Sequence, residues 1–169
     1  MLETVRGTKS KVNIKGHPVH HLLIPFPIAF FIGALASDAA YTATKDKFWS
    51  RASFYLVGGG LATGIAAAGV GMTDFIMIRR ARVFPDGWVH MLGNAAVLGL
   101  AAASFTMRLV DRDSTVVPKG LAIQSAISAL LVATSWYGGE LAYRRRIGVI
   151  PASEAMMREM GEQAQERAA

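Results

Sequence analysis

The sequence predicts an all-α integral membrane protein, a four-helix up-down-up-down bundle with both termini in the cytoplasm. Three observations support this prediction: four long windows almost free of charge, short charged links between them, and an uneven distribution of basic residues. Charged residues make up only 18% of the 169-residue chain, whereas hydrophobic residues make up 52%. Soluble globular domains contain about 25% charged residues, so the composition favours the membrane class.

Each of the four windows is long enough to cross a bilayer. The first contains a single charged residue, Asp38, and the other three contain no Asp, Glu, Lys or Arg. The windows cover residues 22–44, 52–73, 87–107 and 120–139. About 20 apolar residues in a helix cross the roughly 30 Å hydrocarbon core, and a soluble helix would show a charged stripe. We therefore expect four membrane spans, with bounds of about 22–43, 52–77, 87–109 and 119–142.

The rest of the chain is divided between short links and two tails. Short links favour antiparallel neighbours, which is the basis for the up-down-up-down prediction. Inside the second span, Gly60 and Gly64 form a GxxxG pair, which lets helices approach closely in lipid. The predicted divisions are a basic cytoplasmic tail at 1–15, a transmembrane domain at 16–150 and a polar C-terminal tail at 151–169.

The chain has a net charge of +6, and the positions of its basic residues predict its orientation in the membrane. With four spans, the two tails and the second link share one side and carry twelve Lys and Arg residues, whereas the other side carries six. These six are Lys45, Lys47, Arg51, Arg108, Arg112 and Lys119. The positive-inside rule places the richer side in the cytoplasm. We expect these cations to meet the bilayer and its anionic lipid headgroups, not nucleic acid.

Cysteine is absent from the chain, which excludes disulfides, zinc–thiolate sites, iron–sulfur ligation and thiol nucleophiles. No serine stands out beside a histidine, so Ser-His-Asp catalysis has no support and we do not expect an enzyme.

Polar residues converge at one predicted membrane face. Span one begins near three histidines, span two ends at an aspartate, span three begins with a histidine and an asparagine, and span four ends at a glutamate. These residues are His17, His20, His21, Asp74, His90, Asn94 and Glu140. On the opposite face Asp38 is largely alone, with Tyr41 nearby. Ionisable groups inside membrane spans are costly, so such a gathering is a functional hypothesis by default.

The histidines favour a cofactor site. Imidazole suits zinc, copper, nickel and iron, and two histidines from different helices can ligate both faces of a haem. His20 or His21 together with His90 would be the ligands, with His17 and Asn94 also in the cofactor site. A metal set of His20, His90, Asp74 and Glu140 is the related prediction, in which the two acids complete the shell or orient a ligand.

The same histidines and acidic residues also fit a purely structural role. Histidines at helix ends can simply anchor the bundle in the headgroup region. Asp74 and Glu140 can pair with neighbouring arginines, and Glu140 and Arg144 have the favourable four-residue spacing. Both interpretations stay open on the sequence alone.

The chain resembles the bacterial membrane family catalogued as domain of unknown function 2231, over roughly residues 16–150. The matching elements are His17-Pro18-Val19-His20, Phe26-Pro27, Asp38, Gly71-Met72-Thr73-Asp74, His90 with Asn94, Gly138-Gly139-Glu140-Leu141-Ala142-Tyr143 and Gly148-Val149. The family often has proline after the second histidine, where this chain has His21, so His20 and His21 both remain candidates for that role. The resemblance implies a four-helix integral membrane protein. Some relatives are fused to Rieske-type domains, which implies a redox setting.

The sequence therefore predicts a multi-pass protein of the bacterial inner membrane that binds haem b or a transition metal in a redox or electron-transfer accessory role. The alternative is a non-enzymatic structural subunit of a larger membrane complex, or a homo-oligomer built on glycine-rich helix faces. A small transporter or channel ranks last, because one acidic residue on the far side makes a poor path through the membrane.

Overall fold

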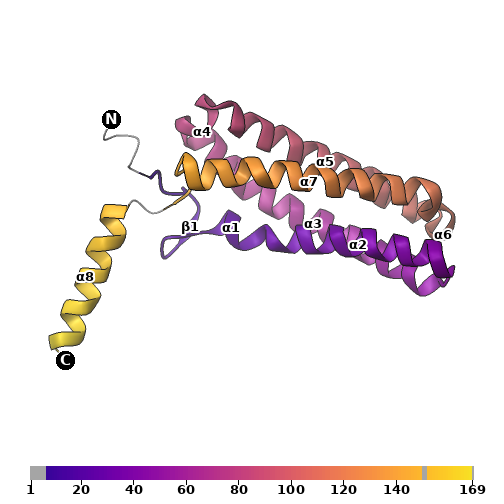
Figure 1. The fold of residues 1–169 in the computed structure, drawn as a ribbon, viewed down its shortest axis with the longest axis horizontal. Coiled ribbons are helices and arrows are strands. Elements are labelled where there is room, and N and C mark those ends of the chain that lie inside the picture. The colour runs from indigo at the N-terminus through magenta and orange to yellow at the C-terminus, as the bar shows by residue number, and fades with distance from the viewer. Residues whose placement is uncertain (1–6, 150–151, 169) are drawn as a thin grey trace.

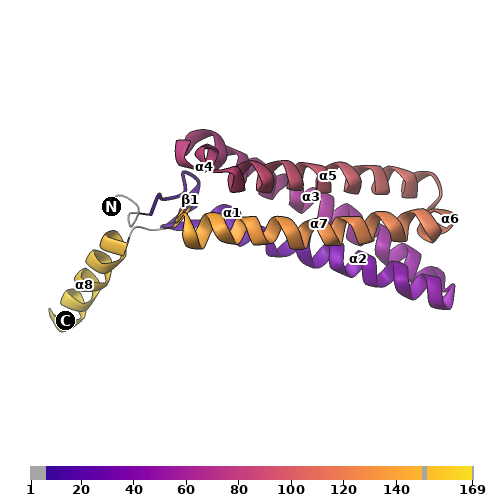
Figure 2. The same cartoon turned by 45° about the horizontal axis from the view of Figure 1, so that its top comes forward.

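The computed structural model describes residues 7–149 and 152–168. Four helical segments are long and apolar enough to cross a membrane: Val19–Thr44, Lys47–Met77, Pro85–Val110 and Arg112–Arg144. They lie side by side as an elongated bundle (Figure 1), and the turned view in Figure 2 shows the same arrangement. The prediction of a helical protein with four segments long and apolar enough to cross a membrane is confirmed.

The elements differ in length, because several segments are short helical extensions of the long ones. In chain order they are β1 (Asn13–Ile14), β2 (His17–Pro18), α1 (Val19–Leu23), α2 (Pro25–Thr44), α3 (Lys47–Met77), α4 (Arg79–Val83), α5 (Pro85–Val110), α6 (Arg112–Thr115), η1 (Val116–Gly120), α7 (Leu121–Gly139), η2 (Glu140–Arg144) and α8 (Ala152–Ala168). Helix α2 packs against α3 and α7, and α5 packs against the same two helices. Each long helix thus has two long neighbours.

Local chemistry sets where the long helices begin. Pro25 and Pro85 occupy the first positions of α2 and α5, where a missing N–H costs least. Asp46 caps α3, since its carboxylate accepts a hydrogen bond from the amide of Phe48 at 2.8 Å. This cap begins α3 at Lys47, five residues before the predicted span, and Lys47 and Arg51 become part of the helix.

The first part of the described chain is more ordered than a free tail. Strands β1 and β2 pair in an antiparallel hairpin, with Asn13 opposite Pro18. Before the hairpin, Thr8 bridges to Ile147: its amide donates to the carbonyl of Arg146 at 2.8 Å, and its carbonyl accepts from Gly148 at 2.7 Å. Residues 7–18 therefore cover the end of the bundle at which α1 and α5 begin. The first six residues of the predicted tail lie outside the described residues.

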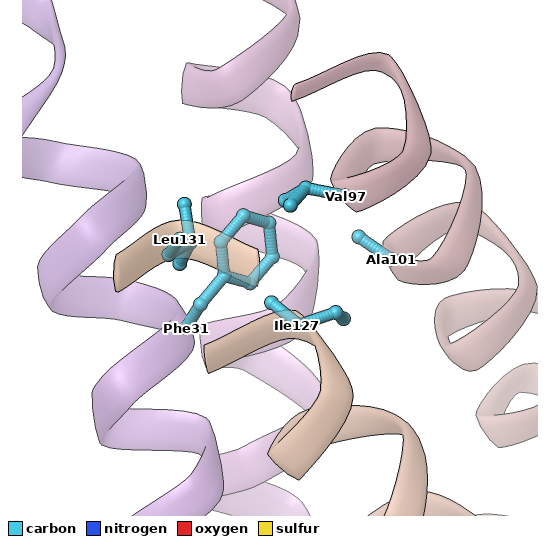
Figure 3. Close-up of a cluster of buried hydrophobic side chains, with 5 residues drawn as sticks. All are labelled: Phe31, Val97, Ala101, Ile127 and Leu131. Carbon is cyan, nitrogen blue, oxygen red and sulfur yellow. The ribbon is translucent and has the colours of Figure 1, made fainter. Parts of the chain in front are cut away.

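An apolar cluster fills the middle of the bundle. Phe31 of α2 meets Val97 and Ala101 of α5 and Ile127 and Leu131 of α7 (Figure 3). A Cβ on Gly60 would lie 2.6 Å from the Phe31 ring, so glycine is required for α3 to approach this ring. The packing role predicted for the glycines of α3 agrees with this contact.

Candidate functional site

Three histidines meet at one end of the bundle, which we name the histidine end. His20 and His21 lie in α1, immediately after the His17–Pro18 strand, and His90 lies in the second turn of α5. The ring centroids of His20 and His90 are 6.3 Å apart, and those of His20 and His21 are 5.9 Å apart. Both pairs are close to perpendicular. Two helices far apart in sequence thus present their imidazoles to each other.

The ring of His20 is held by the backbone of α3. Its Nδ1 lies 2.9 Å from the carbonyl oxygen of Ala67. A carbonyl oxygen can only accept, so Nδ1 carries the proton and the neutral ring keeps its lone pair on Nε2. A Cβ on Gly71 would lie 2.8 Å from His20 Cε1, so the ring rests directly on the α3 backbone.

The ring of His90 is held in the same way by α7. Its Nδ1 lies 2.8 Å from the carbonyl oxygen of Thr134, which again assigns the proton to Nδ1 and the lone pair to Nε2. A Cβ on Gly138 would lie 2.9 Å from His90 Cε1. Asn94 donates its side-chain N–H to the His90 carbonyl at 2.7 Å, which ties the asparagine to its own helix.

The other two histidines are less enclosed. His21 is exposed, and its Cε1 would lie 3.3 Å from a Cβ on Gly148, whose φ of +78° favours glycine. His17 is exposed in β2. Between the two candidates that the sequence left open, His20 is therefore the one whose ring is both anchored to a neighbouring helix and turned toward His90.

The predicted acidic ligands do not join the histidines in a metal set. The carboxylate of Asp74 accepts hydrogen bonds from Ser10 Oγ and from the amide of Lys11, both at 2.6 Å. Glu140 instead pairs with Arg144 at 3.2 Å. Across residues 7–149 and 152–168, no three His, Asp or Glu side chains form a group that could hold a metal ion. The four-residue metal set therefore stays a prediction, and in the structure its two acids are engaged by Ser10, Lys11 and Arg144.

Comparison with known proteins identifies a family whose sequence model covers the four helical segments. The sequence model of the family described as "Predicted membrane protein (DUF2231)" matches residues 16–151, which include every histidine of the chain. The chain belongs to the DUF2231 family. No curated protein and no solved structure matches it significantly, so the activity of this DUF2231 protein has to be argued from its own residues.

A second polar site lies at the opposite end of this DUF2231 bundle, which we name the ion-pair end. Arg108 donates from Nη2 to Asp38 Oδ2 at 2.6 Å and from Nη1 to Oδ1 at 3.1 Å. Both side chains are 0% exposed. The expectation that Asp38 is largely alone on its face is therefore wrong. Arg108 also donates from Nη1 to Ser53 Oγ at 3.0 Å and from Nε to Ser104 Oγ at 3.2 Å.

The network around this ion pair joins all four long helices. Asp38 is in α2, Ser53 in α3, Ser104 and Arg108 in α5, and Gln124 of α7 donates to Ser104 Oγ at 3.4 Å. One signal could have found it from sequence. Asp38 precedes the end of its helix by about two turns and Arg108 is near the end of another, so helices ending at one face place opposite charges near each other.

Proposed function

We propose that His20 and His90 would hold a haem b in a membrane protein with a redox or electron-transfer accessory role. The observation that carries the proposal is the matched pair of imidazoles. Each comes from a different helix, each donates Nδ1–H to a backbone carbonyl of a third or fourth helix, and each keeps Nε2 free. Histidines that bind metals are ordinarily fixed in this way by a hydrogen bond from their other ring nitrogen.

The two rings lie close to each other. Metal–imidazole bonds are about 2.0–2.1 Å long, so two rings that hold one group must be close neighbours. The observed separation of His20 and His90 is 6.3 Å. The glycines beneath the rings, Gly71 and Gly138, let both imidazoles lie close to the helix backbones.

The donor set favours haem over a bare ion. A bare transition metal usually takes three or four protein ligands, and the histidine end offers no such group of described residues. Haem iron needs only axial ligands from the protein, and two histidines are a known axial pair. A transition metal held by His20, His90 and water is the second form of the proposal, with His21 as the nearest further ligand.

When bound, the haem would supply one-electron redox chemistry. The chain's own residues would position the group. Ala67 and Thr134 hold the ring tautomers. Asn94 holds the carbonyl of His90. The chain segment from Gly7 to Pro18, fixed to Asp74, covers this end of the bundle.

The proposed setting is a bacterial inner membrane, with the four spans alternating in direction and both termini in the cytoplasm. The distribution of basic residues supports this orientation. Because Arg108 is buried in the ion pair, the poorer side keeps only five basic residues outside the bundle interior, against twelve on the richer side. The bias that the positive-inside rule uses is therefore larger than the sequence count indicated.

The test is an absorption spectrum and elemental analysis of the full chain purified in detergent. We expect a Soret band with about one iron per chain, abolished in His20→Ala and His90→Ala. His17→Ala is the matched control, because His17 is exposed in β2, and it should retain the band. A folded, colourless and metal-free protein would reject the proposal and leave a non-enzymatic subunit of a larger membrane complex.

A further inference from the structure

A charged pocket opens at the ion-pair end of the bundle, away from the histidines. The cavity has a volume of about 440 Å³. It is lined by Lys47, Arg51, Val110, Asp111, Arg112 and Asp113. Helix α3 begins at Lys47 and α5 ends at Val110, so the pocket lies where two spans end. This is the depth at which lipid headgroups meet a membrane protein.

The two carboxylates of the pocket already have partners within the protein. Asp113 accepts a hydrogen bond from Ser50 Oγ at 2.6 Å and pairs with Lys47 Nζ at 3.3 Å. Asp111 accepts from the amide of Ser114 at 3.1 Å. Hydrogen bonds from Ser114 also hold the pKa of the Asp111 carboxyl below its usual value, so it is charged at neutral pH. Three basic and two acidic side chains leave one positive charge in excess.

The two arginines of the pocket retain unused donors. Arg51 is exposed, and within the part of the chain that the structure describes it has no ion-pair partner. The guanidinium of Arg112 lies over the Phe54 ring at 4.4 Å, and its buried Nε has no hydrogen-bond partner. A planar guanidinium with free donors matches the oxygens of a phosphate.

The pocket also has an apolar border. Val110, which lines it, is 86% exposed, and the adjacent Leu109 is 62% exposed. Both residues belong to a helix that is long and apolar enough to cross a membrane, so their exposed side chains give the pocket a border on which an acyl chain can pack. A ligand that satisfies both parts of the site carries a phosphate beside a hydrocarbon tail. We propose that Arg51 and Arg112 bind the phosphate of an anionic phospholipid headgroup in this pocket.

The experiment is a lipid titration of the full chain in detergent, followed by native mass spectrometry. The probes are phosphatidylglycerol and phosphatidylcholine. We expect phosphatidylglycerol to be retained in preference to phosphatidylcholine. Each basic residue near a charged membrane surface contributes about a fivefold affinity change, so R51Q/R112Q should lose about 25-fold. Lys119→Gln is the matched control, since Lys119 is an exposed cation outside the pocket lining, and it should bind like wild type.

A single variant and a competition experiment complete the test of the phospholipid proposal. Arg112 contacts Phe54, so if the double variant does not fold, R51Q alone should weaken phosphatidylglycerol binding about fivefold with an unchanged circular dichroism spectrum. Unchanged binding in R51Q/R112Q would overturn the proposal. Displacement of phosphatidylglycerol by an equal concentration of glycerol phosphate would also overturn it, because the site would then recognise a free phosphate ester and not a lipid.

Discussion

The two ends of the bundle both contain polar side chains, but these side chains are hydrogen-bonded to different extents. At the ion-pair end, each guanidinium nitrogen of Arg108 has a partner, and both carboxylate oxygens of Asp38 accept from it. At the histidine end, His20 and His90 each use one ring nitrogen and keep the other. A buried ion pair that joins several helices fixes how they align, whereas a neutral ring with a lone pair on Nε2 can take a ligand. We therefore expect the ion-pair end to align the helices, and our proposal places the chemistry at the histidine end.

The largest expected effect is at the ion-pair end. Arg108→Met leaves the Asp38 carboxylate buried without a partner, which should lower the free energy of unfolding by about 3–5 kcal/mol. Unfolding of the detergent-solubilised chain by sodium dodecyl sulfate would measure this change. The double variant D38L/R108M removes both charges and should recover most of the loss. If R108M unfolds within 1 kcal/mol of wild type, the alignment role of this end is wrong.

The next effect is at the histidine end. Gly138→Ala places a methyl group 2.9 Å from His90 Cε1, so the ring must move and its bond to Thr134 is strained. Stability should fall by about 1–3 kcal/mol, and any cofactor band should shift or weaken.

Gly99→Ala is the matched control for this change. A Cβ on Gly99 would have no neighbour within 4 Å, and removing a mid-helix glycine gains about 0.5–1 kcal/mol. Equal thermal unfolding temperatures for the two alanine variants would contradict the close contact between His90 and α7.

A smaller, local effect is expected at Asp74. Asp74→Asn removes the charge that accepts from Ser10 and Lys11, and we expect a loss of about 1–2 kcal/mol confined to the N-terminal segment. Hydrogen exchange at the Lys11 amide should accelerate. Glu140→Gln serves as the control at the same end. Its partner Arg144 is 76% exposed, so loss of this ion pair should not change exchange in the N-terminal segment. Similar exchange in the two variants would show that Asp74 does not hold the segment.

The smallest effect is expected for the exposed pair Lys47–Asp113. The Lys47 side chain is 78% exposed, and surface ion pairs contribute about 0–1 kcal/mol. Lys47→Ala should therefore change the unfolding free energy by less than a quarter of the R108M effect in the same detergent titration. A loss comparable to that of R108M would show that burial of the Arg108–Asp38 pair does not explain its larger effect.

The sequence predicted the helical class well, because spans without charge are a direct consequence of the cost of charge in hydrocarbon. It also predicted that His20 or His21 would meet His90, because both begin helices that share a face. It failed where the answer depends on register between helices. The pairing of Arg108 with Asp38 was not predicted, because the sequence does not give the register of α5 against α2. The engagement of Asp74 by Ser10, 64 residues away, has the same cause.

The most direct test of the central claim is a reduced-minus-oxidised difference spectrum of the purified wild-type chain beside His90→Ala and His17→Ala. A bis-histidine haem predicts sharp absorption bands on reduction in wild type and in His17→Ala, and their loss in His90→Ala. Bands that persist in a folded His90→Ala protein, or that are absent from wild type expressed with adequate haem supply, would contradict the assignment of chemistry to the histidine end.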